Sequence, residues 1–510
     1  MAYEKRPLGV GRRVPAVAAS MAVVAAACMP LAGAAPVSSG AADSARGDDG
    51  VAARADCGPG SRPEPGIQGR VPRSHRESGR SLRGYECNLE LLGQYQGEGA
   101  TWVNPSYKDC AYMGTSFGGM LKKKSQGTQV VDASNPRRPR LSDNLTSPAM
   151  LTSTWESLKV NKKRGLLAGV SVGPGVSGLF FDVYDVKGDC AKPRLLNSVR
   201  DTDLTLPANV LGHEGAWAPD GNTYYASGLA AGSLTAIDVR NPANPKVVFT
   251  GAAGIPANHG FSVSDDGDRL YITRVAPAGV DVVDISAIQN REPIPAISQV
   301  GSVSWADGLA SQHTIPITHD ETPYLVAVDE FGSGGVRFID ISDETDPVVT
   351  DNLRLEIQSS KHVEQRRTDV TGNGLFGYDA HYCDVDRRVD PTRLACGQFQ
   401  SGIRVFDIRD LSEPREVAYF NPPGQSGKRS ELAGSEHAAG AITRVSGISV
   451  SDAINLNLGD PAELFGAVGP PDLTTDWCSS PPRFVGKNQL WVTCQDNGFL
   501  ALKFTNGARR

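Results

Sequence analysis

The sequence has no excess of basic residues. Its 510 residues include 51 Lys and Arg against 57 Asp and Glu, which gives a net charge of -6. Nucleic-acid-binding domains concentrate positive charge on one face, so this balance argues against a nucleic-acid partner. Apolar runs long enough to span a membrane permanently are also missing. Neither a phosphate-binding glycine loop nor an HExxH zinc helix occurs, and these two enzyme classes are therefore not indicated.

An apolar stretch near the N-terminus, Val14–Ala27, follows four basic residues and precedes the small residues 32–34. This order is typical of a signal peptide with its cleavage site. We therefore expect residues 1–35 to be a signal peptide and the mature protein to be secreted or otherwise extracytoplasmic. Cleavage would remove four bases and one acid and so lower the net charge from -6 to -9. A lipid anchor on Cys28 is the alternative form of export.

Large apolar residues are almost missing from residues 36–86, which are rich in Ala, Gly, Ser, Pro and Arg. Such a segment cannot bury enough apolar surface to offset the conformational entropy that ordering would cost. We therefore expect a disordered linker over 36–86, followed by one folded domain over 87–506.

One pattern recurs along that domain: a β-rich run ends in Asp, and a turn and a Pro follow. The aspartates are 53, 53, 46, 56 and 67 residues apart. Periods of about 40 to 55 residues with short alternating strands are typical of the blades of a β-propeller. We expect each Asp to accept backbone hydrogen bonds in its turn. The six copies end at Asp132, Asp185, Asp238, Asp284, Asp340 and Asp407.

The two ends of the domain predict how the ring closes. The last repeat offers three strands, near 483–485, 490–493 and 499–504, whereas Leu89–Tyr95 resembles a fourth strand with no blade before it. Joining them would remove two exposed sheet edges. The prediction is an all-β, seven-bladed propeller, monomeric, whose N-terminal strand closes the last blade.

The repeat resembles the LVIVD-repeat β-propeller family over about residues 88–504. The third-strand consensus is matched by Val282-Val283-Asp284-Ile285 and Phe338-Ile339-Asp340-Ile341, and the turn by Asn241-Pro242-Ala243-Asn244-Pro245. The resemblance implies the propeller fold and an exported protein. It leaves the activity open, because the family is mostly uncharacterised and a propeller fold does not determine function. The last blade departs from the motif, with Lys503 in place of Asp.

Cysteine usage favours disulfides. Eight of the nine cysteines follow the signal peptide, and no CxxC pair occurs, which in an exported chain indicates disulfides rather than a zinc or redox site. Cys383 and Cys396 fall on neighbouring strands of blade six, and Cys478 and Cys494 fall on the matching strands of blade seven, so both pairs should lie within bonding range. The other four cysteines allow three pairings, of which we favour Cys57–Cys87 with Cys110–Cys190.

Histidine is rare, with eight in the chain, yet four share one repeat position. Each precedes its repeat Asp by 25 to 27 residues, at the start of the strand that lines a propeller channel. Imidazole suits iron, copper and zinc, so the pattern predicts a transition-metal site at the channel mouth. The alternative is a structural role, in which the imidazoles hydrogen-bond the backbone between blades. The four are His213, His259, His313 and His381; the same count back from Lys503 adds Asp476, and Trp155 is the nearest counterpart in blade two.

Two connections on the same face, about 355–379 and 422–475, are far longer than ordinary loops. Long loops on a rigid scaffold commonly carry binding sites or act as lids. Two functions therefore stay open. One is an extracytoplasmic binding or interaction protein that uses this loop-rich face for a small molecule or a protein. The other is a metal-dependent oxidoreductase or lactonase-like hydrolase at the channel mouth.

Overall fold

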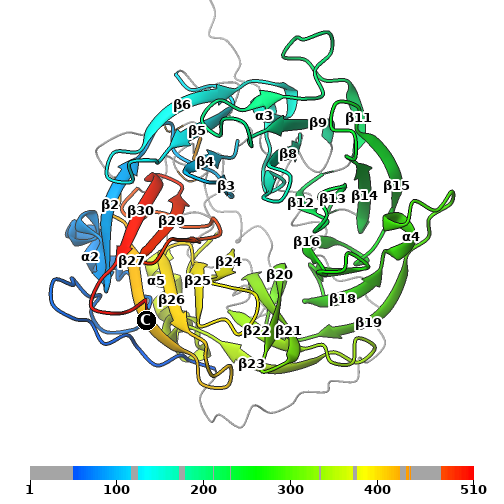
Figure 1. Cartoon of the computed structure of the whole chain (residues 1–510). Helices are drawn as coiled ribbons and strands as arrows, with labels where there is room; N and C mark the ends of the chain where they lie inside the picture. Colours follow the sequence, from blue (N-terminus) through cyan, green and yellow to red (C-terminus); the bar gives the residue numbers. More distant parts are fainter. Residues whose placement is uncertain are drawn as a thin grey trace, which may run out of the picture.

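The computed structural model describes residues 50–509 apart from 116–123, 172–177, 211, 230, 332–334, 371–375, 426–431, 433, 436 and 438–472. Seven sheets form a ring around a central axis (Figure 1). The seven-bladed all-β propeller predicted from the sequence is confirmed. The expected signal peptide, Cys28 and most of the 422–475 insertion lie outside the described residues. Within them, no helix has the length and apolar character needed to cross a membrane.

Each blade is an antiparallel sheet whose strands follow one another from the channel to the rim (Figure 1). Blades one to three consist of β3 (Ser106–Tyr107), β4 (Cys110–Met113), β5 (Thr128–Asp132) and β6 (Arg140–Leu145); β7 (Lys159–Asn161), β8 (Leu166–Val170), β9 (Gly178–Asp185) and β10 (Arg194–Leu195); and β12 (Glu214–Trp217), β13 (Thr223–Ser227), β14 (Ser233–Asp238) and β15 (Lys246–Ala252). A further strand, β11 (Pro207–Val210), pairs with β9.

Blades four to six continue the ring. They consist of β16 (Asn258–Val263), β17 (Arg269–Arg274), β18 (Gly279–Asp284) and β19 (Ser298–Ser304); β20 (Leu309–His319), β21 (Thr322–Phe331), β22 (Val336–Asp340) and β23 (Val348–Leu353); and β24 (Cys383–Val385), β25 (Arg393–Gly397), β26 (Ile403–Asp407) and β27 (Arg415–Asn421). Short helices lie between strands: α3 (Pro148–Thr152), α4 (Ser286–Gln289), η3 (Glu356–Gln358), η4 (Ser360–His362) and α5 (Val363–Val370).

Blade seven is built from both ends of the domain. Its inner strands are β28 (Arg483–Val485), β29 (Gln489–Cys494) and β30 (Gly498–Phe504), and its outer strand is β2 (Leu89–Tyr95). The register runs from Leu89 opposite Phe504 to Tyr95 opposite Phe499, and Figure 1 shows β2 in blue beside β30 in red. The closure expected from the strand count is confirmed.

The repeat aspartates end the third strand of their blades and hold the turn that follows. In all six copies a side-chain oxygen accepts the backbone N–H two residues later, as Asp238 does from Arg240 at 2.9 Å. This bond replaces a backbone partner where the strand stops, which is why an Asp recurs there. The apolar residues before each Asp are buried, and β18 is buried up to Asp284.

The prediction of disorder over 36–86 is wrong for residues 50–86. This segment contains α2 (Arg73–Glu77), η1 (Arg80–Arg83) and β1 (Tyr85–Cys87), and β1 adds a fifth strand to blade six beside β27. Residues 36–49 lie outside the described part of the chain. The segment is poor in large apolar residues, but polar contacts and a disulfide also hold it in place.

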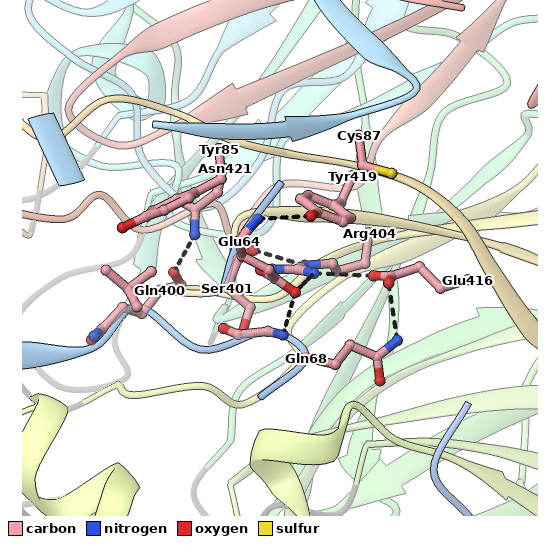
Figure 2. A network of polar contacts seen from close by, with 12 residues as sticks. Glu64, Gln68, Tyr85, Cys87, Gln400, Ser401, Arg404, Glu416, Tyr419 and Asn421 are labelled. Atoms are coloured by element: carbon pink, nitrogen blue, oxygen red, sulfur yellow. Dashed lines mark hydrogen bonds and ion pairs between the residues drawn. The ribbon is translucent and has the colours of Figure 1, made fainter. Parts of the chain in front are cut away.

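The main polar contact of the segment is a buried ion pair (Figure 2). Arg404, whose side chain is fully buried, donates to both oxygens of Glu64, at 2.9 and 2.6 Å. Its guanidinium also reaches Glu416 at 3.1 Å, and Gln68 donates to the other oxygen of Glu416 at 2.9 Å. The charge of Arg404 is thus compensated by one carboxylate of the N-terminal segment and one of β27.

Four disulfides are present, and they are the four pairs favoured from the sequence. Cys383–Cys396 joins the first and second strands of blade six, and Cys478–Cys494 joins the matching positions of blade seven. Cys57–Cys87 links the N-terminal segment to β1, the strand that precedes the closing strand β2. The pairs are Cys57–Cys87, Cys110–Cys190, Cys383–Cys396 and Cys478–Cys494.

Candidate metal centre

Three of the four repeat histidines meet on the channel axis. His213 directly precedes β12, His259 lies on β16, and His381 precedes β24 by two residues, so each sits at the inner strand of its blade. All three side chains are buried. The Nε2 atoms of His213 and His259 are 3.1 Å apart. The repeat therefore brings these imidazoles together, as the sequence pattern suggested.

A carboxylate that the sequence analysis did not select lies between them. Glu156 has Oε2 at 3.1 Å from Nε2 of His213 and 3.8 Å from Nε2 of His259, and Oε1 at 3.0 Å from Nε2 of His381. It occupies the blade-two position where Trp155 was the expected counterpart of the histidines. A search for any metal-binding residue type at that position, rather than for His, would have found it.

A second carboxylate, Glu330, comes from the end of β21 in blade five. Its Oε1 is 3.3 Å from Nε2 of His381, and its Oε2 is 3.8 Å from Nε2 of His259. Glu330 belongs to a second strand rather than a first, so no repeat position pointed to it. The candidate centre thus receives one side chain from each of five consecutive blades: Glu156, His213, His259, Glu330 and His381.

His313 does not join this group. Its Nε2 accepts the backbone N–H of Cys383 at 3.4 Å, and its ring packs on Tyr382 with centroids 4.6 Å apart. The pairing of β20 with β21 contains a bulge between Ser311 and His313, and a bulge re-aims the side chains that follow it. In blade five, Glu330 therefore occupies the place expected for His313.

Asp476 also lies elsewhere, in a separate buried group with His437 and Asp496. Its two oxygens accept four hydrogen bonds, from the backbone N–H groups of Trp477, Asp496 and Asn497 and from the side-chain amide of Asn497. His437 Nδ1 is 2.6 Å from the carboxylate of Asp496. A carboxylate so fully engaged holds the blade-seven hairpin together and is poorly suited to bind an ion.

The tautomer of His381 bears directly on metal binding. Its Nδ1 is 2.7 Å from the backbone carbonyl of Ser479, which can only accept, so Nδ1 carries the proton. In the neutral ring, Nε2 then directs a lone pair toward the carboxylates of Glu156 and Glu330. Within the described residues, Nε2 of His381 makes no hydrogen bond of acceptable geometry. A lone pair that faces two carboxylates is unfavourable unless a cation lies between them or the ring gains a second proton.

These contacts determine the pKa values of the histidines and carboxylates. Burial alone would lower the pKa of His381, but the two carboxylates outweigh burial and raise that pKa to about 10. Burial, together with the nearby His213, lowers the pKa of His259 to about 3, so this ring stays neutral. The pKa of Glu156 is held well below its usual range against the effect of burial, because His213 and His381 stabilise the charged carboxylate.

Polar groups around the centre orient its carboxylates. Gln312 on β20 donates to Oε2 of Glu156 at 2.9 Å. Lys159 donates to Oε1 of Glu214 at 3.1 Å, and burial raises the pKa of Glu214 to about 7. Gly260 leaves the space that Glu214 fills, because a Cβ there would lie 1.7 Å from Oε2 of Glu214.

Aromatic side chains pack against two of the histidines, His381 and His213. Trp102 and Phe399 lie against His381, with ring centroids 5.4 and 5.1 Å away, and Trp155 lies 6.1 Å from His213. Trp102 and Phe399 are buried in the main apolar cluster of the channel. A low-dielectric surrounding strengthens every charge interaction at the centre.

The donor set fits a transition metal. Three imidazole nitrogens and two carboxylates converge, all from buried residues. They form two groups of three residues: Glu156, His213 and His259, and Glu156, Glu330 and His381. In each group all ligand atoms lie within 4.8 Å of one another. Mixed imidazole and carboxylate donors suit iron and zinc, and sulfur ligands typical of copper(I) are not part of the set.

No family model matches the chain, and no curated protein matches it. Among solved structures, a putative 6-phosphogluconolactonase from Bacteroides uniformis is similar at 14% identity and a TM-score of 0.44, over 62% of this chain and 84% of that chain. The periplasmic gluconolactonase of Pseudomonas aeruginosa is similar at 17% identity and a TM-score of 0.44, over 61% and 82%. Likeness at this level does not bear on activity.

Proposed function

We propose that this protein is an exported propeller of the LVIVD-repeat type that binds a transition-metal ion in its channel. We further propose that it is an enzyme whose activity depends on that ion. The observation that carries the proposal is the convergence of three buried imidazoles on two buried carboxylates, with Nε2 of His381 at 3.0 Å from Glu156 and 3.3 Å from Glu330. A bound cation would satisfy His381, Glu156 and Glu330 at once. The backbone carbonyl of Ser479 supports His381 as such partners do in known metal sites.

Export is supported by several features together. The four disulfides require an oxidising compartment, and residues 1–35 have the composition of a signal peptide. We expect the centre to acquire its metal outside the cytoplasm or during export.

Catalysis is favoured by Glu214, which lies next to His213 in the chain. Its Oε2 is buried and has no hydrogen-bond partner among the described residues, while Oε1 pairs with Lys159. A carboxyl group that holds or releases a proton near neutral pH suits a general acid or base beside a metal-bound water. We therefore favour metal-assisted hydrolysis over redox chemistry, and a redox-active metal at full occupancy would reverse that preference.

The proposal is tested by metal analysis of protein exported with its own residues 1–35 and purified without a histidine tag. We expect at least one equivalent of a transition metal by elemental mass spectrometry. Zinc would agree with metal-assisted hydrolysis, and iron or manganese would favour redox chemistry instead. Glu156→Gln should lower the occupancy at least tenfold, whereas His319→Ala, a histidine on β20 away from the centre, should not change it. Wild-type protein that stays metal-free after incubation with each metal would overturn the proposal.

The same preparations separate the enzyme from a binding protein that uses the loop-rich face. The hydrolysis rates of metal-loaded protein and of protein stripped of metal by a chelator would be compared on a panel of lactones and carboxylic esters. Hydrolysis that depends on the metal and falls in Glu214→Gln supports the enzyme. A loaded protein that turns over no member of the panel favours the binding protein.

A further inference from the structure

The ligand atoms of the centre do not form one cluster. The five residues fall into two groups, one with Glu156, His213 and His259, the other with Glu156, Glu330 and His381. Only Glu156 belongs to both, and no group of ligand atoms within 4.8 Å of one another among the described residues unites all five. A single ion with bonds of about 2.0–2.2 Å keeps its ligand atoms within about 4.4 Å of one another. One ion therefore does not account for the full set.

Glu156 is arranged as a bridge between the two groups. Its Oε2 is directed toward His213 and His259, and its Oε1 toward His381. Glu330 has Oε1 at 3.3 Å from Nε2 of His381 and Oε2 at 3.8 Å from Nε2 of His259, but it is grouped only with Glu156 and His381. Glu156 therefore presents one oxygen to each group, whereas Glu330 belongs to the second group alone.

We propose that the channel holds two transition-metal ions bridged by Glu156. His213 and His259 would bind the first ion, and His381 and Glu330 would bind the second. This inference rests on the metal binding proposed above and adds the number of ions and the assignment of ligands. Gln312, which donates to the Oε2 of Glu156, fixes the orientation of the bridge.

Two ions also define the ligand that the centre prefers. Two divalent cations would carry four positive charges, against two negative charges from the carboxylates of Glu156 and Glu330 and none from neutral imidazoles. The surplus would favour binding of an oxyanion or hydroxide, the chemistry that two-metal hydrolases supply. The substrate class is accordingly an ester or lactone whose reacting oxygen becomes negative.

The stoichiometry of metal binding tests the inference. Mature protein would be stripped with dipicolinate and titrated with Co²⁺, followed by visible absorption and calorimetry. Wild type should saturate at two equivalents, and electron paramagnetic resonance should show magnetic coupling between the two ions. His381→Ala should saturate at one equivalent without coupling, and His319→Ala should behave as wild type.

The outcomes distinguish this inference from the proposed function. Saturation of wild type at one equivalent would overturn the two-ion centre and leave metal binding standing. No binding at all would overturn both. Circular dichroism identifies variants that fail to fold, and the wild-type stoichiometry decides the question without them.

Discussion

At the scale of single residues, two polar groups outside the set of five candidate ligands orient members of that set. Gln312 donates to Glu156 at 2.9 Å, and Ser479 accepts from His381 at 2.7 Å, so each fixes one ligand in place. Of the two, only Gln312 acts through its side chain and can be replaced cleanly.

Replacing the amide of Gln312 should weaken metal binding without removing it. We expect Gln312→Ala to lower the affinity about 10- to 100-fold, the usual effect of losing a partner that orients a ligand. Competition with a chromophoric chelator would measure the change. Gln94→Ala removes an amide from β2 in blade seven instead and should leave the affinity unaltered. Equal losses in both variants would show that the effect is on folding rather than on Glu156.

At the scale of elements, a buried ion pair is one of the contacts that hold the N-terminal segment to blade six, beside the pairing of β1 with β27. Glu64→Ala leaves Arg404 with Glu416 as its only carboxylate contact on the residues that the structure describes. Removing one partner of a buried ion pair costs about 3–5 kcal/mol. We expect a lower urea midpoint and faster proteolysis within residues 50–84. Arg62→Ala breaks the exposed pair with Glu86 and should cost less than about 1 kcal/mol.

The contrast between this segment and the blades shows what sequence reasoning can reach. Blades were predictable because each repeats an apolar strand and its Asp-ended turn at a regular spacing. The segment at 50–86 was missed because its charge partner, Arg404, lies 340 residues from Glu64 in the chain. Composition describes what a segment can bury by itself, and it contains no information on a distant partner.

The candidate centre shows the same limit at closer range. The shared repeat position correctly predicted that three histidines lie close together and pointed to the neighbourhood of Glu156, because equivalent positions on the inner strands surround one axis. For His313 the prediction was wrong, because a bulge in β20 interrupts the repeat there. It gave no sign of Glu330, because Glu330 lies on the second strand of its blade, outside the repeat position that the histidines share.

At the scale of the whole molecule, the centre joins five consecutive blades, while β2 and β30 close the ring on the far side. Ions bound to Glu156, His213, His259, Glu330 and His381 would link blades two to six and stabilise the folded protein alone, because the ligands are far apart in the unfolded chain. Binding at a thousand times the dissociation constant adds about 4 kcal/mol to the free energy of unfolding.

Chelation should therefore lower the melting temperature of wild type, and re-adding metal should restore it. In Glu156→Gln the melting temperature should be the same with and without chelator, because its bridging carboxylate is lost. Scanning calorimetry of both proteins, each with dipicolinate and with zinc, measures the effect. The disulfides are untouched by the chelator, so their contribution cancels in the comparison. A shift of equal size in Glu156→Gln would place the stabilising metal outside the channel, and the group around His437 and Asp496 would then be the next site to examine.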